Sequence, residues 1–169
     1  MKEMVRYGSI LGLICIVAGG FLAGINALTS SRIIAQAQAE EEAGLKEVVP
    51  LAAHFEAAKS GEKTLYYKAH DKDGKLIGVA FKAQAKGYSS DIETLVGMLP
   101  DGTILAIKIL SQNETPGLGS RVAEAEFTGQ FKNQKDLNNI QAITGATISS
   151  RAVIDSVKKE AGKIKELIQ

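Results

Sequence analysis

The sequence has few of the residues that build metal centres and disulfide frameworks. Its one cysteine, Cys15, lies inside an apolar run, and its two histidines, His54 and His70, lie apart from each other. A single cysteine excludes a disulfide within the chain and any cysteine-based metal cluster. Neither histidine has a cysteine or a carboxylate partner at ligand spacing, so the sequence predicts no metal site.

No sign of charge dominates the chain either. Lysine and arginine total 20 against 19 aspartates and glutamates, which gives a formal net charge of +1 over 169 residues. No long-range field therefore favours nucleic acid or an acidic substrate as a partner. The sequence also lacks a Ser-His-Asp set, paired carboxylates in a recognisable context, and a glycine-rich dinucleotide fingerprint after a strand. It therefore predicts no catalytic residue and no complete active site of its own.

What the sequence does contain is a long uncharged run near its N-terminus, residues 7–28. At about 1.5 Å per helical residue the run spans roughly 33 Å, which matches a bilayer core. Lys2 and Arg6 precede it, whereas Arg32 and the acidic cluster of Glu40 to Glu42 follow it. Basic residues near a span favour the cytoplasmic side. We therefore predict a single pass through the cell (inner) membrane, with the N-terminus cytoplasmic and the rest of the chain extracytoplasmic.

A cleaved signal peptide is the alternative interpretation of this run. Residues 35–37 and 37–39, both Ala-Gln-Ala, resemble small-residue cleavage sites. The apolar run is longer than the usual core of about 7 to 15 residues, and the alanines fall late after it. Both observations favour a retained membrane anchor.

The segment that follows the anchor predicts a helical stalk. Residues 29–61 are rich in Ala, Glu and Leu, with a helical rhythm that Pro50 interrupts. We interpret them as a stalk helix, a break near Gly44 or before Pro50, and a second short helix that ends around Ser60 and Gly61. The acidic run is interpreted as a solvated face.

The remainder of the chain predicts an α+β fold. Two pairs of strand-like segments, each pair joined by a turn sequence, indicate two hairpins in an antiparallel sheet. These segments are 64–68, 76–82, 92–98 and 103–110. A short helix is predicted over 121–127 and a long one over 149–168, where apolar residues recur at spacings of three and four. Strands followed by flanking helices are typical of the α+β class.

The most informative motif is Thr144-Gly145-Ala146-Thr147, directly before the last predicted helix. A small-residue turn lets backbone N–H groups approach a ligand, and the positive end of the helix favours an anion. A plain helix cap is the alternative, because threonine and serine are common caps. About 30 residues upstream lies a second constrained loop, Glu114-Thr115-Pro116-Gly117-Leu118-Gly119. The two loops together could hold the two ends of an elongated phosphate-bearing ligand.

With these residues the chain resembles the FMN-binding domain family. That family includes the G subunit of the Rnf ion-translocating oxidoreductase and the C subunit of the sodium-pumping NADH:quinone reductase. The matching features are Gly87-Tyr88 before a strand, the loop 114–119, and residues 143–147 followed by Ser149 and Ser150. With the N-terminal span included, the resemblance covers nearly the whole chain, and the compact length is more similar to the Rnf subunit.

The resemblance implies that FMN is attached covalently, through a phosphoester bond, to the last threonine of the motif. In that family a dedicated flavin transferase installs FMN from FAD. The usual acceptor pattern of the transferase has an aspartate six residues before this threonine, where this sequence has Gln141. The resemblance places the flavin ring near the loop 114–119. The predicted cofactor-binding residues are Thr147 (the phosphoryl threonine), Thr144, Gly145, Ala146, Ile148, Ser149, Glu114, Thr115, Pro116, Gly117, Leu118, Gly119 and Tyr88.

The resemblance also implies a function. It predicts a membrane-anchored electron carrier in a complex that couples electron flow between reduced ferredoxin and NAD to sodium or proton transport. Residues 1–6 would be cytoplasmic, 7–28 the anchor, 29–61 the stalk and 62–169 the extracytoplasmic FMN-binding domain. The implied partners are the other subunits of the complex, the membrane and the flavin transferase. Three alternatives stay open: the C subunit of the quinone reductase, a module that binds a phosphate-bearing ligand without a covalent bond, and a structural anchor without cofactor.

Overall fold

A computed structural model describes residues 2–60 and 63–168 of the chain. The chain divides into two compact units, residues 1–39 and 40–169. Helix α1 (Lys2–Val48) forms the first unit and continues into the second. Within the described residues it is the one helix that is long and apolar enough to cross a membrane, and its most apolar stretch is fully exposed. The predicted apolar N-terminal helix is confirmed.

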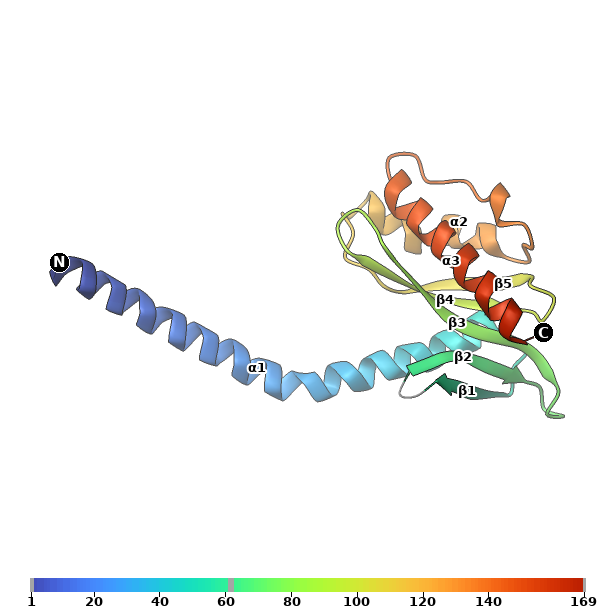
Figure 1. Ribbon diagram of the computed structural model, residues 1–169, viewed down its shortest axis with the longest axis horizontal. Coiled ribbons are helices and arrows are strands. Elements are labelled where there is room, and N and C mark those ends of the chain that lie inside the picture. Colours follow the sequence, from blue (N-terminus) through green and yellow to red (C-terminus); the bar gives the residue numbers. More distant parts are fainter. Residues whose placement is uncertain (1, 61–62, 169) are drawn as a thin grey trace. The chain divides into compact units, whose positions relative to one another are not determined.

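The second unit is built on a five-stranded antiparallel sheet. Its strands follow one another in the order β1-β2-β3-β4-β5, so each strand pairs with its neighbour in sequence (Figure 1). The strands are β1 (His54–Ser60), β2 (Lys63–His70), β3 (Leu76–Lys86), β4 (Asp91–Met98) and β5 (Ile104–Ser111). The two predicted hairpins correspond to β2–β3 and β4–β5, and the α+β class is confirmed.

The predicted second stalk helix is wrong. Helix α1 ends at Val48, before Pro50, and strand β1 occupies the segment that the sequence assigns to the second helix; Gly61, at its predicted end, lies outside the described residues. The composition of this segment is rich in alanine, which favours a helix. Backbone pairing with β2 overrides that local preference, for example where Phe55 lies opposite Ala69.

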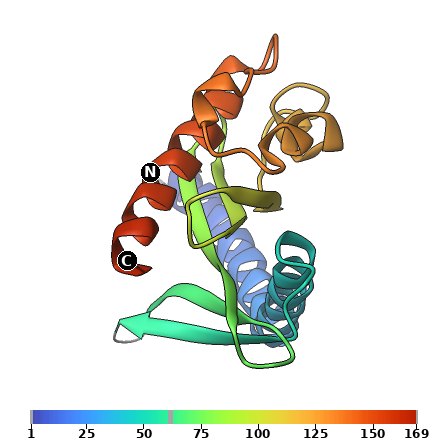
Figure 2. The same ribbon diagram turned by 90° about the vertical axis from the view of Figure 1, so that its right-hand side faces the viewer.

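One face of the sheet packs against the C-terminal helix α3 (Thr147–Ile168), which runs along it (Figure 2). Apolar residues of the sheet and of α3 form a single buried cluster with Phe127 and Phe131. Those two phenylalanines come from the short helix α2 (Ala125–Thr128) and the 3₁₀ turn after it, and their rings meet edge to face at 5.5 Å. The predicted apolar stripe of the last helix is therefore buried, at Val153, Val157 and Ile164.

The other face of the sheet packs against the C-terminal end of α1. Leu45, Val48 and Val49 form a second buried cluster with residues of β2, β3 and β4. Gly97 of β4 makes this approach feasible, because a Cβ atom there would lie 2.2 Å from the Val48 carbonyl oxygen. Three layers therefore make up the unit: the end of α1, the sheet, and α3 with the short helices.

The acidic run on α1 is more than a solvated face. The Glu41 carboxylate accepts a hydrogen bond from the Tyr67 hydroxyl at 2.8 Å and pairs with the Lys82 ammonium at 2.6 Å. Lys82 also pairs with Glu93 at 3.1 Å. Burial raises the pKa of the Tyr67 hydroxyl, and the hydrogen bond to Glu41 and its charge raise it further. This polar network joins the end of α1 to β2, β3 and β4.

Candidate functional site

The motif at residues 144–147 forms a tight turn that leads into α3. The Ala146 N–H donates to the Ile143 carbonyl at 3.0 Å, and Gly145 has a φ of +85°. This left-handed conformation at the third position of a turn is one that glycine adopts without a steric penalty. The motif therefore needs its glycine for backbone geometry.

Ser150 fixes this turn to the helix. Its hydroxyl accepts a hydrogen bond from the Ile143 N–H at 3.1 Å and donates one to the Ala146 carbonyl at 2.8 Å. The Ser150 side chain is fully buried. The sequence pattern includes Ser150 after the motif but predicts no role for it. Its position one helical turn after Ala146 is the sequence feature that could have indicated these two hydrogen bonds.

The start of α3 has an alanine where a polar cap usually stands. Ala146 directly precedes the helix and has no side-chain acceptor for its first N–H groups. Thr147, the first helical residue, is exposed. Within residues 2–60 and 63–168 its hydroxyl makes no hydrogen bond. Thr147 is therefore not the helix cap that the alternative interpretation of the motif predicts.

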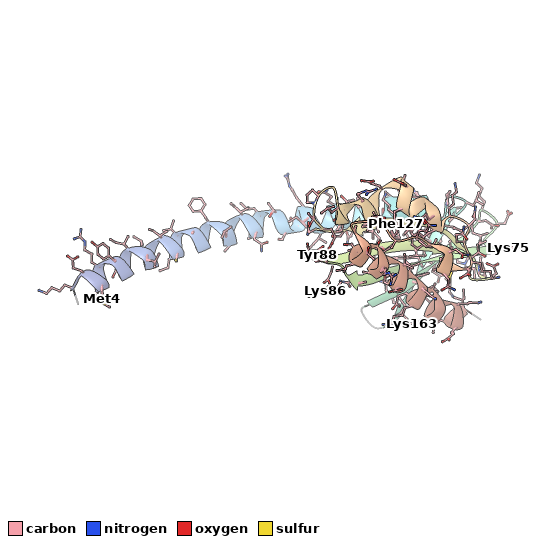
Figure 3. All side chains as sticks on the ribbon, turned by 90° about the horizontal axis from the view of Figure 1, so that it is seen from above. Met4, Lys75, Lys86, Tyr88, Phe127 and Lys163 are labelled. Carbon is pink, nitrogen blue, oxygen red and sulfur yellow. The ribbon has the colours of Figure 1, made fainter. Side chains whose placement is uncertain are left out.

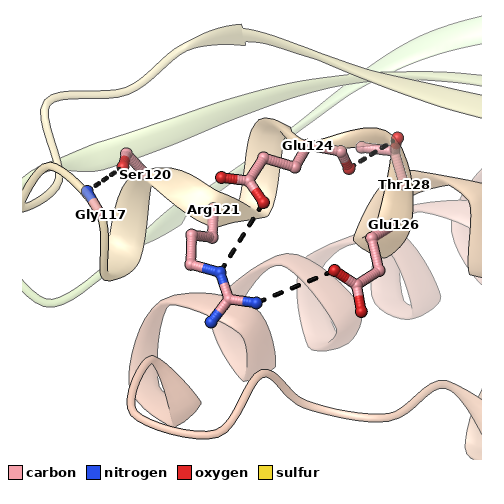
Figure 4. Close-up of polar contacts among 6 residues, drawn as sticks. All are labelled: Gly117, Ser120, Arg121, Glu124, Glu126 and Thr128. Atoms are coloured by element: carbon pink, nitrogen blue, oxygen red, sulfur yellow. Dashed lines mark hydrogen bonds and ion pairs between the residues drawn. The ribbon is translucent and has the colours of Figure 1, made fainter.

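The second predicted loop is a turn as well. The Leu118 N–H donates to the Thr115 carbonyl at 3.1 Å, with Pro116 and Gly117 at the two central positions and a φ of +73° at Gly117. The Gly117 N–H donates to the Ser120 hydroxyl at 3.0 Å (Figure 4). The order of proline and then a left-handed glycine is typical of a type II turn.

The Glu114 carboxylate joins this loop to the other two segments of the site. It accepts hydrogen bonds from the backbone N–H groups of Tyr88 (3.2 Å), Ser89 (3.0 Å) and Ser90 (2.9 Å), all in the turn between β3 and β4. It also accepts one from the Ser149 hydroxyl, in the first turn of α3, at 2.6 Å. The segment at 87–90 is thus a turn anchored by a buried carboxylate.

Two glycines give this carboxylate its space. A Cβ atom on Gly87 would lie 2.6 Å from a Glu114 carboxylate oxygen, and one on Gly119 would lie 2.7 Å from the other oxygen. Burial raises the pKa of Glu114, but the hydrogen bonds from Ser149 and the three N–H groups outweigh it and hold the pKa below its ordinary value. Glu114 is therefore ionised at neutral pH.

These segments enclose a pocket of about 390 Å³, a size typical of small-ligand sites. All of its lining residues belong to the predicted cofactor set. They are Tyr88, Glu114, Thr115, Leu118, Gly119, Gly145, Ala146, Thr147, Ile148 and Ser149. Three predicted residues do not line it: Pro116 and Gly117 shape the turn, and Thr144 lies at a separate cavity.

That second cavity has a volume of about 240 Å³ and is more polar. Thr144 lines it together with Arg121, Gln130 and Gln141. The Arg121 guanidinium pairs with Glu124 at 3.7 Å and with Glu126 at 3.9 Å (Figure 4). The turn at 143–146 therefore separates two cavities.

The mouth of the first pocket is apolar. Tyr88, Leu118 and Ile148 come from three different segments, and their exposed fractions are 70%, 51% and 58%. Tyr88 lies at the end of the sheet opposite to Lys75, as Figure 3 shows. Exposed apolar side chains that meet at a pocket are typical of ligand or partner sites. This pocket offers an apolar wall, a helix N-terminus and the Thr147 hydroxyl, which has no hydrogen-bond partner in the described part of the chain; together they fit a flat ring that carries a phosphate.

Comparison with known proteins identifies the family. Residues 87–161 match the FMN-binding domain, and residues 1–48 match the RnfG N-terminal region. The chain is 35% identical over 165 residues to the G subunit of the proton-translocating ferredoxin:NAD(+) oxidoreductase complex of Clostridium ljungdahlii, a match that covers 91% of this chain and 88% of the relative. This chain belongs to the family of G subunits of ion-translocating oxidoreductase complexes.

Other relatives extend the comparison. The G subunit of the Na(+)-translocating ferredoxin:NAD(+) oxidoreductase complex of Acetobacterium woodii is 33% identical, and the match covers 92% of this chain and 89% of that protein. The crystal structure of Shewanella oneidensis NqrC has a TM-score of 0.51 at 21% identity and covers 70% of this chain and 74% of that one. That likeness shows the shared fold. The chain is thus a G-type subunit with an FMN-binding domain and an N-terminal helix consistent with membrane anchoring.

Proposed function

We propose that this subunit relays electrons through FMN that is covalently attached to Thr147. FMN supplies reversible electron transfer when bound, and the chain supplies attachment, orientation and electrostatic surroundings. The observation that carries the proposal is the Thr147 hydroxyl, which is exposed and makes no hydrogen bond to any of the described residues. It lines the pocket at the start of a helix whose preceding residue is alanine. A phosphate joined there would lie beside N–H groups that Ala146 cannot cap.

The charges around the pocket favour a covalent bond over reversible capture of a phosphate-bearing ligand. Among the described residues that line it, none is lysine or arginine, and Glu114 is an ionised carboxylate. A free phosphate would be attracted by one helix N-terminus and repelled by the Glu114 carboxylate, so tight reversible binding is not expected. A covalent bond makes retention independent of that affinity.

We propose a flavin transferase as the partner that forms this bond, with FAD as the donor. The Thr147 oxygen would bond to the phosphorus of the FMN half, the bond from that phosphorus to the AMP half would break, and the hydroxyl proton would go to solvent. AMP is the leaving group, and no electrons are transferred. Such a reaction needs an accessible hydroxyl, and Thr147 is exposed.

We further infer the setting of the electron relay from the relatives' names. The complex would couple electron flow between reduced ferredoxin and NAD to the transport of sodium ions or protons, and the other subunits would be the redox partners. Residues 1–6 would lie in the cytoplasm, 7–28 would span the membrane, and the flavin domain would lie on the extracytoplasmic side. The pair of basic residues before the apolar run supports this orientation.

Replacement of Thr147 tests the attachment. The chain produced together with a flavin transferase is expected to fluoresce as a flavoprotein band after denaturing electrophoresis and to show the mass increment of FMN. Thr147→Ala should abolish both signals. Thr128→Ala is the matched control, because Thr128 lies in α2, where its hydroxyl donates to the Glu124 carbonyl at 3.2 Å, away from the pocket.

A flavin signal that persists in Thr147→Ala would refute the attachment at this residue. Flavin that co-purifies with the wild type but is lost on denaturation would instead favour non-covalent binding. A wild-type complex that transfers electrons without any flavin on this subunit would support the structural-anchor alternative.

A further inference from the structure

One carboxylate lies at the junction of all three segments that surround the pocket. Glu114 accepts five hydrogen bonds: three from backbone N–H groups at residues 88–90, one from the Ser90 hydroxyl at 3.3 Å and one from the Ser149 hydroxyl. The Glu114 residue is 6% exposed. A carboxylate has about four lone-pair sites, so these donors occupy its accepting capacity. The carboxylate is therefore bound to the protein and is not free to hydrogen-bond a ligand.

The Glu114 carboxylate is also the source of the negative charge in the pocket wall. Of the described residues that line the pocket, Glu114 is the one that is charged at neutral pH. Arg121, which lines the neighbouring cavity, pairs with Glu124 and Glu126. A buried charge with no cation beside it acts over a longer distance than a charge in water.

We propose that Glu114 is a positioning residue that also fixes a negative charge at the flavin pocket and thereby lowers the midpoint potential of the bound flavin. The inference rests on the proposed function. Reduction adds electrons to the flavin, so a fixed negative charge in the pocket wall opposes it. The hydrogen bonds hold the carboxylate in place, and the tight packing at Gly87 and Gly119 prevents it from moving away from the pocket.

A spectroelectrochemical titration of the flavinylated chain tests this assignment. Glu114→Gln keeps the shape and removes the charge, and we expect it to favour reduction by about tenfold, which corresponds to a positive shift of about 59 mV per electron. Glu56→Gln is the matched control, since it removes an exposed carboxylate of β1 that does not line the pocket. A midpoint potential in Glu114→Gln that equals that of the control would overturn the proposal.

A second pair of variants covers the case in which Glu114→Gln does not accumulate with flavin. Ser90→Ala and Ser149→Ala each remove a donor to the carboxylate and leave its charge in place. Less of the negative charge is then compensated, so both variants are expected to lower the midpoint potential. An unchanged or raised potential in both would refute the charge assignment.

The failure of this inference is distinguishable from the failure of the proposed function. Flavin fluorescence after denaturing electrophoresis reports attachment before any potential is measured. A wild-type chain without the fluorescent band contradicts the proposed function. A chain that carries flavin, but whose potential does not respond to Glu114, contradicts only the present inference.

Discussion

Gly119→Ala tests whether the packing around the Glu114 carboxylate stabilises the pocket, because the added methyl group would contact three atoms there. The new Cβ atom would lie 2.7 Å from a Glu114 carboxylate oxygen, 2.8 Å from the Glu114 Cβ atom and 2.9 Å from the Ser149 hydroxyl oxygen. Contacts this short require a displacement. Gly119 has no positive φ, so the effect of alanine there is steric.

The size of the effect follows from the atoms that must move. Overpacking of a tight interior costs about 1–3 kcal/mol. Displacement of the carboxylate also weakens its hydrogen bond to Ser149, and hydrogen bonds to charged groups contribute about 1.5–3 kcal/mol. Alanine recovers up to about 1 kcal/mol of backbone entropy relative to glycine. We therefore expect Gly119→Ala to lower the free energy of unfolding by about 2–4 kcal/mol.

Urea unfolding of the full chain in detergent measures this change. Near-ultraviolet circular dichroism is a suitable signal, because three of the four tyrosines, Tyr66, Tyr67 and Tyr88, belong to the second unit. Gly162→Ala is the control: Gly162 lies within α3, a Cβ atom there would meet nothing within 4 Å, and the variant is expected to gain about 0.5–1 kcal/mol. A Gly119→Ala chain within about 0.5 kcal/mol of the wild type would refute this account of the site.

Two further predictions concern acid stability and topology. The pKa of Glu114 is lower in the folded chain than its ordinary value of 4.5, so its ionised form stabilises the fold above that pH, and this contribution is lost as the pH falls through the folded-state pKa. Urea titrations between about pH 6 and 3 should show a fall in the free energy of unfolding that is smaller in Glu114→Gln than in the wild type. Equal falls in the two chains would contradict this prediction. In intact spheroplasts, added trypsin is expected to cleave after the exposed Lys75 and Lys163; protection there, with cleavage after lysis, would reverse the proposed orientation.

The sequence was sufficient for the elements whose stability is local or periodic. The uncharged run predicts an apolar helix because its composition alone separates it from the rest of the chain. Helix α3 was predictable from the recurrence of Val153, Val157 and Ile164, and it begins only two residues before the predicted start. The hairpins were predictable because turn residues separate alternating segments.

The elements that were missed depend on partners that are distant in sequence. Strand β1 has a helix-like composition, and it is a strand because β2 supplies its hydrogen bonds. Glu41 lies in an acidic run, and its interactions with Tyr67 and Lys82 arise only when the end of α1 packs on the sheet. Neither outcome leaves a signal in a local window of the sequence.

The role of Glu114 could not be predicted from the sequence for the same reason. Its donors lie 24–26 residues upstream and 35 residues downstream. The glycines that make room for it, Gly87 and Gly119, read as turn residues in the sequence, whereas in the structure they permit close packing against a carboxylate. The sequence could therefore name the residues that line the pocket without showing which of them hold the others in place.

The charge of Glu114 also connects the two proposals about the flavin. An ionised carboxylate without a lysine or arginine in the same wall disfavours any additional anion in the pocket, whether the phosphate of the cofactor or the negative charge gained on reduction. The first effect would weaken reversible binding, and the proposed phosphoester at Thr147 would retain the cofactor regardless of that affinity. The second effect would persist after attachment and lower the midpoint potential. The proposed covalent attachment would thus let the site keep a charge that favours the oxidised cofactor without losing the cofactor itself.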